Sequence, residues 1–191
     1  MKQDQLIWVN KQDEIIGYGN KQETHQLEKL HRAYSVFIYD TRTKKMLLQK
    51  RAVHKYHSSG LWSNACCSHP YKSESWAQAI KRGIQNELGI SPVIGANEEI
   101  FSMHKKKVIP LHFLDKFYYY SNYGELSEHE IDYVFLFMPD ELLISQIVPN
   151  LNEIEDLKWM NISEIDNSFQ KAPYDFTSWF QQAYQIAKRS L

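Results

Sequence analysis

The sequence contains only two cysteines among its 191 residues, and they are neighbours, Cys66 and Cys67. Adjacent cysteines have a geometry that resists an ordinary disulfide, so a reducing compartment is expected. No apolar run approaches the roughly 18 residues that suggest a membrane span. The polar start, residues 1–4, also lacks the apolar segment of a secretory signal. We therefore predict a cytoplasmic protein with no membrane partner.

An excess of charge of either sign is also missing. The formal net charge is −1 at pH 7, and the basic residues are scattered along the chain. Nucleic acids and anionic membranes would need a long-range attraction that this distribution does not provide. A small anion held by a local basic pocket is still compatible with it. The sequence also lacks Pro/Gly/Ser-rich linkers and repeats, so we expect one domain over residues 1–191, as a monomer or weak homodimer.

The pattern of apolar residues predicts many short strands and few helices. The clearest helix begins near residues 73–75, where Ser75 and Gln78 have capping-box spacing, and ends at Gly89. A second helix is expected over residues 177–188. β-Branched and aromatic runs predict strands over residues 6–9, 14–18, 34–39, 46–50, 61–67, 113–120, 130–138 and 156–160. This combination predicts an α+β sandwich with a mixed sheet.

Two predicted strands each carry reactive side chains at a spacing of two residues. Cys67 and His69 would project from one face of the first strand, and Cys66 from the other. Glu128 and Glu130 repeat this spacing on a later strand. The two strands therefore offer a thiol, an imidazole and two carboxylates for a site.

A further carboxylate is expected on the predicted central helix. Glu87 follows Ile80 by seven residues, which places it beside the apolar stripe of the helix. Burying an unpaired carboxylate is costly, so a cation, either arginine or a metal ion, is expected next to it. A salt bridge to Arg82 or Lys81 is the alternative interpretation.

The same helix carries a degraded Nudix box. The run Ser68-x5-Glu74-x7-Arg82-Gly83-Ile84-Gln85-Asn86-Glu87-Leu88-Gly89-Ile90 follows the register of that box, G-x5-E-x7-R-E-U-x-E-E-x-G-U. Gly83 and Asn86 replace two acidic residues with which Nudix hydrolases gather metal ions, so a diphosphate would be bound but poorly cleaved. The box is preceded by Asn-x-Cys-Cys-Ser-His-Pro and followed by Glu-His-Glu-Ile-Asp-Tyr. Together, in this order, the motifs resemble those of type 1 isopentenyl-diphosphate Δ-isomerases.

The resemblance spans residues 21–179 and implies a fold and an activity. The fold is a Nudix-like mixed β-sheet sandwich with a central Nudix helix and a C-terminal helix. The activity is the interconversion of isopentenyl and dimethylallyl diphosphate, the small prenyl diphosphates that supply starter units for isoprenoid biosynthesis. Such an isomerase protonates an unactivated alkene to a tertiary carbocation and removes a proton from the adjacent carbon, so two acid/base groups must flank the substrate.

The resemblance also assigns catalytic residues. Cys67 and Glu130 would lie on opposite faces of the allylic substrate, Glu130 supplying a proton and Cys67 removing one in the forward direction. Tyr118, ten residues before Glu128, would lie near Glu130, and Tyr119 would face the other side of the strand. Trp179 would stabilise the cation with its π face in a dry pocket.

Two metal sites are implied by the same resemblance. The first would hold Mn²⁺, Mg²⁺ or Zn²⁺. The second would hold Mg²⁺ on Glu87 and bridge it to the diphosphate. At the first site five residues separate two of the histidines where the family usually has six, so neighbouring residues are alternatives to the first histidine. The expected ligands of that site are His25, His31, His69, Glu128 and Glu130.

Basic side chains that match those of the family would hold the diphosphate, and these are Lys21, Arg51 and Lys55. Related sequences often carry another basic residue at the position of Gly83, and its contact is either lost here or taken over by Lys81 or Arg82. The remaining histidines are expected at the surface or behind the ligands; these are His54, His57, His104, His112 and His129.

Two other functions remain open at this point. The chain could be a Nudix hydrolase of a nucleoside or prenyl diphosphate, although Gly83 and Asn86 argue against hydrolysis. It could also be a catalytically silent module that binds a metal or a diphosphate. Release of phosphate without isomer formation would favour the hydrolase, and an unaltered Cys67→Ala variant would favour the silent module.

Overall fold

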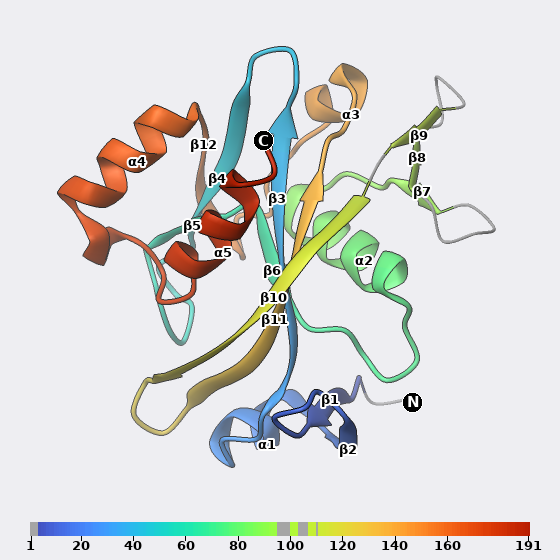
Figure 1. Ribbon diagram of the computed structural model, residues 1–191, viewed down its shortest axis with the longest axis vertical. Helices are drawn as coiled ribbons and strands as arrows, with labels where there is room; N and C mark the ends of the chain where they lie inside the picture. Colours follow the sequence, from blue (N-terminus) through green and yellow to red (C-terminus); the bar gives the residue numbers. More distant parts are fainter. Residues whose placement is uncertain (1–3, 95–99, 103–106, 110) are drawn as a thin grey trace.

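The computed structural model describes residues 4–94, 100–102, 107–109 and 111–191, and a mixed nine-stranded sheet forms its centre (Figure 1). The central strand β3 (His31–Asp40) pairs in parallel with β11 (Ser127–Phe137) and antiparallel with β1, β4 and β6. The other strands of this sheet are β1 (Leu6–Val9), β2 (Ile15–Gly19), β4 (Lys45–Arg51), β5 (Trp62–Asn64), β6 (Cys66–Ser68), β10 (Leu111–Asn122) and β12 (Ile154–Met160). A small separate sheet contains β7 (Val93–Ile94), β8 (Ile100–Ser102) and β9 (Lys107–Ile109).

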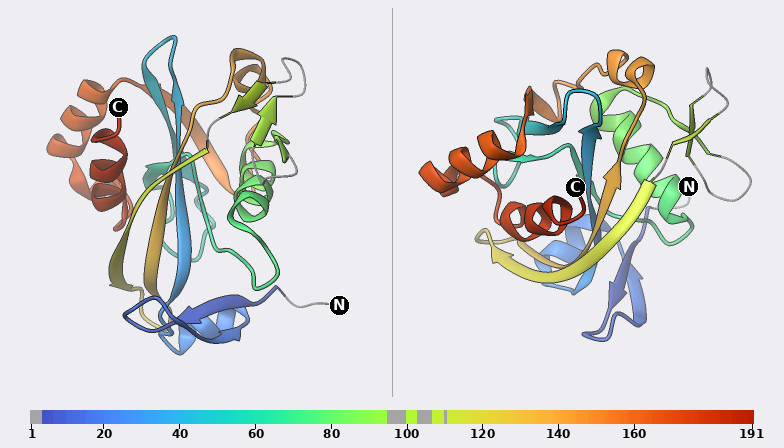
Figure 2. Two further views of the ribbon diagram at one scale, coloured as in Figure 1. Left: turned by 45° about the vertical axis from the view of Figure 1, so that its right-hand side comes forward. Right: turned by 45° about the horizontal axis from the view of Figure 1, so that its top comes forward.

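Helices cover both faces of the large sheet, as two turned views show (Figure 2). On one side lies α2 (Trp76–Leu88), and on the other lie α4 (Ile162–Lys171) and α5 (Phe180–Lys188). Shorter helices are α1 (Lys21–Gln26), α3 (Glu141–Ser145) and the 3₁₀ turn η1 (Pro173–Asp175). In the described part of the chain, no helix has the length and apolar character needed to cross a bilayer.

Helix α2 matches its prediction closely. Ser75 and Gln78 form the reciprocal capping box, and Gly89 ends the helix in the left-handed conformation with φ of 70°. A glycine there avoids the steric cost of a Cβ in this conformation. The apolar face of α2, with Ile80 and Ile84, packs against β3 in a core that also contains Tyr34 and Val36.

The opposite face of the sheet has its own apolar core. Phe180 and Tyr184 of α5 are buried against Phe37 of β3. The helix was expected from residue 177 but begins at Phe180, and Trp179 takes the N-cap position. The expected α+β sandwich with a central and a C-terminal helix is therefore confirmed, with a later start for the last helix.

The prediction of one continuous strand over residues 61–67 is wrong, because the structure has two strands there. The chain forms β5 up to Asn64 and β6 from Cys66, and the two pair with different strands, β4 and β3. The Asn64 side chain bridges the break, because its amide donates to the carbonyls of Val36 and Cys66 at 3.3 and 2.8 Å. The break at Ala65 therefore moves the Cys67 strand beside β3.

Candidate active site

A cavity of about 200 Å³ lies where β3, β4, β6 and β11 meet the C-terminal half of α2. Most of the residues predicted for catalysis, diphosphate binding and metal binding line it. They are Lys21, Arg51, Lys55, Cys67, His69, Glu87, Glu128, Glu130 and Trp179. Segments far apart in the sequence therefore meet at one small cavity.

The sheet register explains how these segments meet. Both β6 and β11 pair with β3, where Cys67 lies opposite Ser35 and Glu130 lies opposite His31. Alternate residues of a strand point to one face, so Cys67 reaches the cavity while Cys66 is fully buried in the α2 core. The predicted division of the two cysteines between opposite faces is confirmed.

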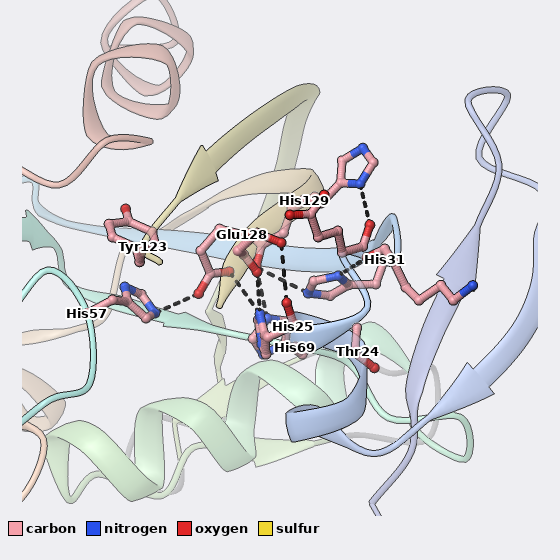
Figure 3. A network of polar contacts seen from close by, with 12 residues as sticks. Thr24, His25, His31, His57, His69, Tyr123, Glu128 and His129 are labelled. Atoms are coloured by element: carbon pink, nitrogen blue, oxygen red, sulfur yellow. Dashed lines mark hydrogen bonds and ion pairs between the residues drawn. The ribbon is translucent and has the colours of Figure 1, made fainter. Parts of the chain in front are cut away.

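Four predicted metal ligands form a tight cluster. One ligand atom from each of His25, His31, His69 and Glu128 lies within 4.8 Å of all the others, and all four residues are buried (Figure 3). Glu130 adjoins the cluster, with its Oε1 2.9 Å from Nε2 of His69 and 3.4 Å from Nε2 of His31. The expected ligand set therefore occupies one place in the fold.

The five-residue spacing between His25 and His31 does not remove His25 from this cluster. Helix α1 carries His25 near its last turn, and the connection back to β3 turns at Glu28, which has φ of 51°. Nδ1 of His25 lies 2.9 Å from the Ser127 carbonyl, and Nδ1 of His31 lies 2.7 Å from the Lys29 carbonyl. Each ring orientation is fixed by the backbone of a neighbouring segment.

The chemistry of this cluster fits a divalent cation. Nε2 of His25 and Nε2 of His31 are buried and have no hydrogen-bond partner among the described residues. Burial of unsatisfied polar atoms is costly, and metal-bound histidines commonly use the other ring nitrogen to hold a carbonyl, as both do here. The free nitrogens and the carboxylates are suitable ligands for Mn²⁺, Mg²⁺ or Zn²⁺.

Electrostatics keep two of the three histidines ready to bind a cation. Burial lowers the pKa of His69 well below its usual value, and nearby His31, Lys21 and His25 add to this effect. Burial also lowers the pKa of His25, although the charge of Glu128 opposes it. Burial acts in the same sense on His31, but the nearby Glu130 carboxylate, with Oε1 3.4 Å from Nε2, outweighs it and raises the pKa of His31. Neutral imidazole is the form that binds metal.

The tyrosine beside Glu130 is Tyr119 and not Tyr118, so this part of the prediction is wrong. The Tyr119 hydroxyl donates to Glu130 Oε2 at 2.7 Å, and the ring is 8% exposed. Tyr118 is 50% exposed, and its hydroxyl lies 3.0 Å from Nε2 of His129. In the β10–β11 hairpin Tyr119 lies opposite Glu130. The spacing of ten residues from Glu128 selected the wrong tyrosine, because neighbouring side chains of a strand point to opposite faces and an error of one residue selects the wrong face.

The Cys67 thiol is enclosed by polar side chains. It donates to Asn64 Oδ1 at 2.9 Å, and Ser63 Oγ lies 3.6 Å from its sulfur. Asn64 Oδ1 also accepts from Nε1 of Trp179 at 3.3 Å. Burial raises the pKa of Cys67 to about 12, and the charges of Glu87 and Asp132 add to the effect. This environment therefore favours the thiol over the thiolate.

Glu87 is buried beside the cavity without the salt bridge that was weighed for it. Gln49 donates to its Oε2 at 2.8 Å. Burial raises the pKa of Glu87 to about 7, against the effect of this hydrogen bond. Arg82 instead forms a bidentate pair with Glu74 at 2.6 and 2.8 Å and donates to the His69 carbonyl at 2.7 Å. The alternative interpretation of Glu87 as a partner of Arg82 is therefore wrong.

The three predicted diphosphate ligands surround the same cavity. Nε of Arg51 is buried and has no hydrogen-bond partner among the described residues, and its guanidinium lies 5.5 Å from the Trp179 ring centre. Lys55 pairs with Glu153, with 2.5 Å between Nζ and Oε2. Lys21 begins α1 and lies over the Tyr56 ring at 5.3 Å. These cations give the cavity a positively charged side.

Gly83 occurs where a larger side chain has no room. A Cβ at this position would lie 2.3 Å from the Tyr34 hydroxyl and 3.0 Å from the Cys66 sulfur. The Tyr34 hydroxyl donates to the Ala79 carbonyl at 2.7 Å, so it is fixed in place. A basic side chain at position 83 is therefore incompatible with Tyr34 in this arrangement.

Sequence reasoning missed an acidic residue at the cavity. Asp132 is 2% exposed, accepts from Ser35 Oγ at 2.7 Å, and lines the cavity beside the two predicted carboxylates. Burial raises its pKa well above the usual value, and the charge of Glu130 adds to this. The signal was present, because Asp132 continues the two-residue spacing of Glu128 and Glu130.

Comparisons with known proteins agree with the fold. A NUDIX domain matches residues 29–180. A solved structure from Deinococcus radiodurans matches with a TM-score of 0.65 and 15% identity, over 96% of this chain and 98% of that one. A NUDIX hydrolase structure from Nitrosomonas europaea matches with a TM-score of 0.55 and 14% identity, over 83% and 88% of the two chains. The fold and the site therefore define a protein with the Nudix fold.

Closer sequence relatives narrow this class. Isopentenyl-diphosphate Delta-isomerase 2 of Aromatoleum aromaticum is 35% identical over 178 residues, which cover 93% of this chain and 82% of the relative. Isopentenyl-diphosphate Delta-isomerase of Photobacterium profundum is 33% identical over 191 residues, which cover 99% and 97%. The chain belongs to the isopentenyl-diphosphate Δ-isomerase family, as the order of its motifs predicted.

Proposed function

We propose that this protein is an isomerase that interconverts isopentenyl and dimethylallyl diphosphate through a tertiary carbocation. The observation that carries the proposal is that Cys67 and Glu130 line one small cavity together with Trp179 and three cations. Residues 1–28 contribute Lys21 and His25 to this cavity and cluster, which supports a single catalytic domain over residues 1–191.

In the proposed forward reaction, Glu130 gives a proton to the terminal alkene carbon, and Cys67 takes a proton from the carbon next to the cation. The double bond then lies one position further along the carbon chain, and the diphosphate is unchanged. Glu130 is 4% exposed and Cys67 is partly buried at the cavity, and this limited contact with water supports the role, because a tertiary carbocation is captured by any water within reach. Trp179 is 4% exposed and offers a π face to the developing charge.

The surroundings of Cys67 and Glu130 shift the pKa values of the two groups in opposite directions. Burial raises the pKa of Cys67, whereas for Glu130 the effect of burial is outweighed by hydrogen bonds involving Glu128, His31 and Tyr119, which lower its pKa. Opposite shifts of two acid/base groups at one cavity are the pattern expected of a pair that acts on one substrate.

Two cations complete the proposed site. His25, His31, His69 and Glu128 would hold a divalent ion, which would supply positive charge beside Glu130 and balance the buried carboxylates. Glu87 would hold Mg²⁺, which would neutralise charge on the diphosphate. The chain's own contribution is to hold the substrate head with Lys21, Arg51 and Lys55.

Replacing Tyr119 by phenylalanine is expected to lower kcat by about 10- to 100-fold, because a hydrogen bond to a charged group is worth about 1.5–3 kcal/mol. The Tyr119 hydroxyl contacts Glu130, so its loss changes the acidity and orientation of the carboxylate. Steady-state rates at saturating substrate measure the effect. Tyr118→Phe is the matched control, since its exposed hydroxyl contacts His129, and its rate should stay unchanged. A larger loss of kcat in the Tyr118 variant would contradict the assignment of Tyr119, in place of Tyr118, as the partner of Glu130.

Replacing Lys55 by alanine is expected to raise the KM for isopentenyl diphosphate about tenfold or more, with a smaller change in kcat. The diphosphate keeps its charge through the reaction, so Lys55 binds substrate and transition state alike. Initial rates over a range of substrate concentrations separate the two constants. Lys50→Ala is the control, because Lys50 pairs with Glu155 and does not line the cavity. An effect of Lys55→Ala confined to kcat would contradict a role in binding.

The activity itself is tested by incubating the purified protein with isopentenyl diphosphate and Mg²⁺ and measuring two products in one sample. Proton NMR detects dimethylallyl diphosphate, and a phosphate assay detects hydrolysis. The proposal predicts isomer without phosphate release, because Gly83 and Asn86 replace acidic residues of the hydrolytic box. Phosphate release with no isomer would instead identify a Nudix hydrolase.

A further inference from the structure

A histidine outside the expected ligand set is buried against the metal cluster. His57 lies between β4 and β5, and 8% of its surface is exposed. His54, three residues earlier in the same segment, is exposed, and its ring contacts only the Asn152 carbonyl among the hydrogen bonds of the described residues. Polar side chains that are buried normally have partners that explain their position.

Both ring nitrogens of His57 have such partners. Nε2 lies 2.6 Å from Glu128 Oε1, a contact drawn as a dashed line in Figure 3, and Nδ1 lies 3.2 Å from Ser58 Oγ. A carboxylate oxygen accepts, so Nε2 carries a hydrogen and donates to Glu128. The second carboxylate oxygen, Oε2, lies 3.7 Å from Nδ1 of His25. One oxygen of Glu128 is therefore held by His57, and the other lies next to a histidine of the metal cluster.

The His57 ring is also fixed by packing. It stacks on Tyr123 from the β10–β11 turn, with 4.8 Å between the ring centres. It meets Tyr56 edge-to-face at 4.6 Å and Trp179 at 6.1 Å. Aromatic rings on several sides leave the imidazole little freedom to rotate. The donor to Glu128 is therefore preorganised.

We propose that His57 is a positioning residue for the divalent-ion site, whose Nε2–H holds the Glu128 carboxylate so that Oε2 faces His25, His31 and His69. The inference rests on the metal site of the proposed function. It assigns His57 no contact with the ion, because its Nε2 is engaged by Glu128 and it is outside the four-residue cluster. Hydrogen bonds that orient metal-binding carboxylates generally strengthen ion binding.

The test compares ion affinity in three variants of the full chain. His57→Phe keeps an aromatic ring and removes the donor. His57→Gln keeps an amide donor near the position of Nε2. His54→Ala changes a histidine of the same segment that does not touch the cluster. Mn²⁺ affinity is measured by isothermal titration calorimetry, and thermal unfolding of the ion-free variants shows whether each one is folded.

The proposal predicts that His57→Phe weakens Mn²⁺ binding by about 10- to 100-fold, the range observed when an outer partner of a metal ligand is removed. His57→Gln should lose markedly less affinity, and His54→Ala should match the parent. Equal losses in the Phe and Gln variants would overturn the proposal, because a direct ligand or a packing role would give that result. Unchanged affinity in His57→Phe would overturn it as well.

A measurement on the unmodified protein covers the case in which His57→Phe does not fold. In ¹⁵N-histidine-labelled protein, the Nε2–H of His57 should give a protected proton signal at low field, assigned by its absence in His57→Gln. A rapidly exchanging signal would overturn the proposal. Failure of the parent to bind Mn²⁺ would refute the metal site and this proposal together, whereas the isomer assay tests the proposed reaction separately.

Discussion

Replacing Cys67 by alanine is expected to lower kcat for isomer formation by at least about a thousandfold, within the range seen for removal of a general acid or base. The thiol is the group proposed to take a proton in the forward direction and to give one in the reverse direction. Alanine can do neither. Rates are measured in both directions by proton NMR of the two diphosphates, at saturating Mg²⁺.

Cys66→Ala is the matched control for this prediction. The Cys66 sulfur faces Tyr34 and Gly83 in the α2 core and is fully buried. Its removal should cost about 1 kcal/mol of stability, like many core truncations, and leave turnover close to that of the parent. A Cys67→Ala variant with turnover within tenfold of the parent would show that the sulfur is not part of the chemistry.

Replacing Glu130 by glutamine is expected to abolish turnover to a similar extent, by at least about a thousandfold. Glutamine has nearly the same shape, but it has no proton to give at this site and cannot accept one as a carboxylate does. The variant also loses the charge that faces His31 and His69. Single-turnover rates and Mn²⁺ affinity, both measured on the same preparation, separate the loss of proton transfer from the loss of a ligand.

Glu128→Gln provides the comparison, because Glu128 lies on the same face of β11 and belongs to the ion cluster. Its proposed role is limited to ion binding. Excess Mn²⁺ should therefore restore a large part of the activity of Glu128→Gln and none of that of Glu130→Gln. Recovery of the Glu130 variant at high Mn²⁺ would contradict a proton-transfer role and leave Glu130 as a ligand alone.

The fold was predictable where apolar periodicity and capping agreed. Helix α2 shows both signals, and its two ends follow from the capping residues Ser75 and Gly89. Helices α1, α3 and α4 were missed although side chains cap each of them, namely Asn20, Asp140 and Asn161. These helices have five to ten residues, so their periodicity is short, and the capping residues alone were not used.

The sequence predicted which side chains share a face of one strand, but not which side chains of two paired strands lie together. The alternation over Cys66 and Cys67 correctly separated core from cavity. The choice between Tyr118 and Tyr119 depended on the length of the β10–β11 turn, and a difference of one residue reversed the result. Local alternation is fixed by backbone geometry, whereas the pairing of two strands depends on a turn that the motif spacing did not describe.

The sequence predicted most of the residues that form the site, but fewer of the contacts between them. The motif order named His25, His31, His69 and Glu128, which the fold brings together. It gave no reason to place His57 beside Glu128, because that contact joins a loop to a strand 71 positions away. Such long-range contacts depend on tertiary packing that no local pattern encodes.

The most direct measurement of the central claim follows isopentenyl diphosphate in D₂O with the protein and Mg²⁺. If a protein group that exchanges with solvent protonates the alkene, the dimethylallyl product must carry deuterium in a methyl group, and the proton lost from the neighbouring carbon must appear in the solvent. Proton and deuterium NMR detect both events. A product formed without deuterium would require direct hydrogen migration within the substrate and would contradict proton transfer by Glu130 and Cys67.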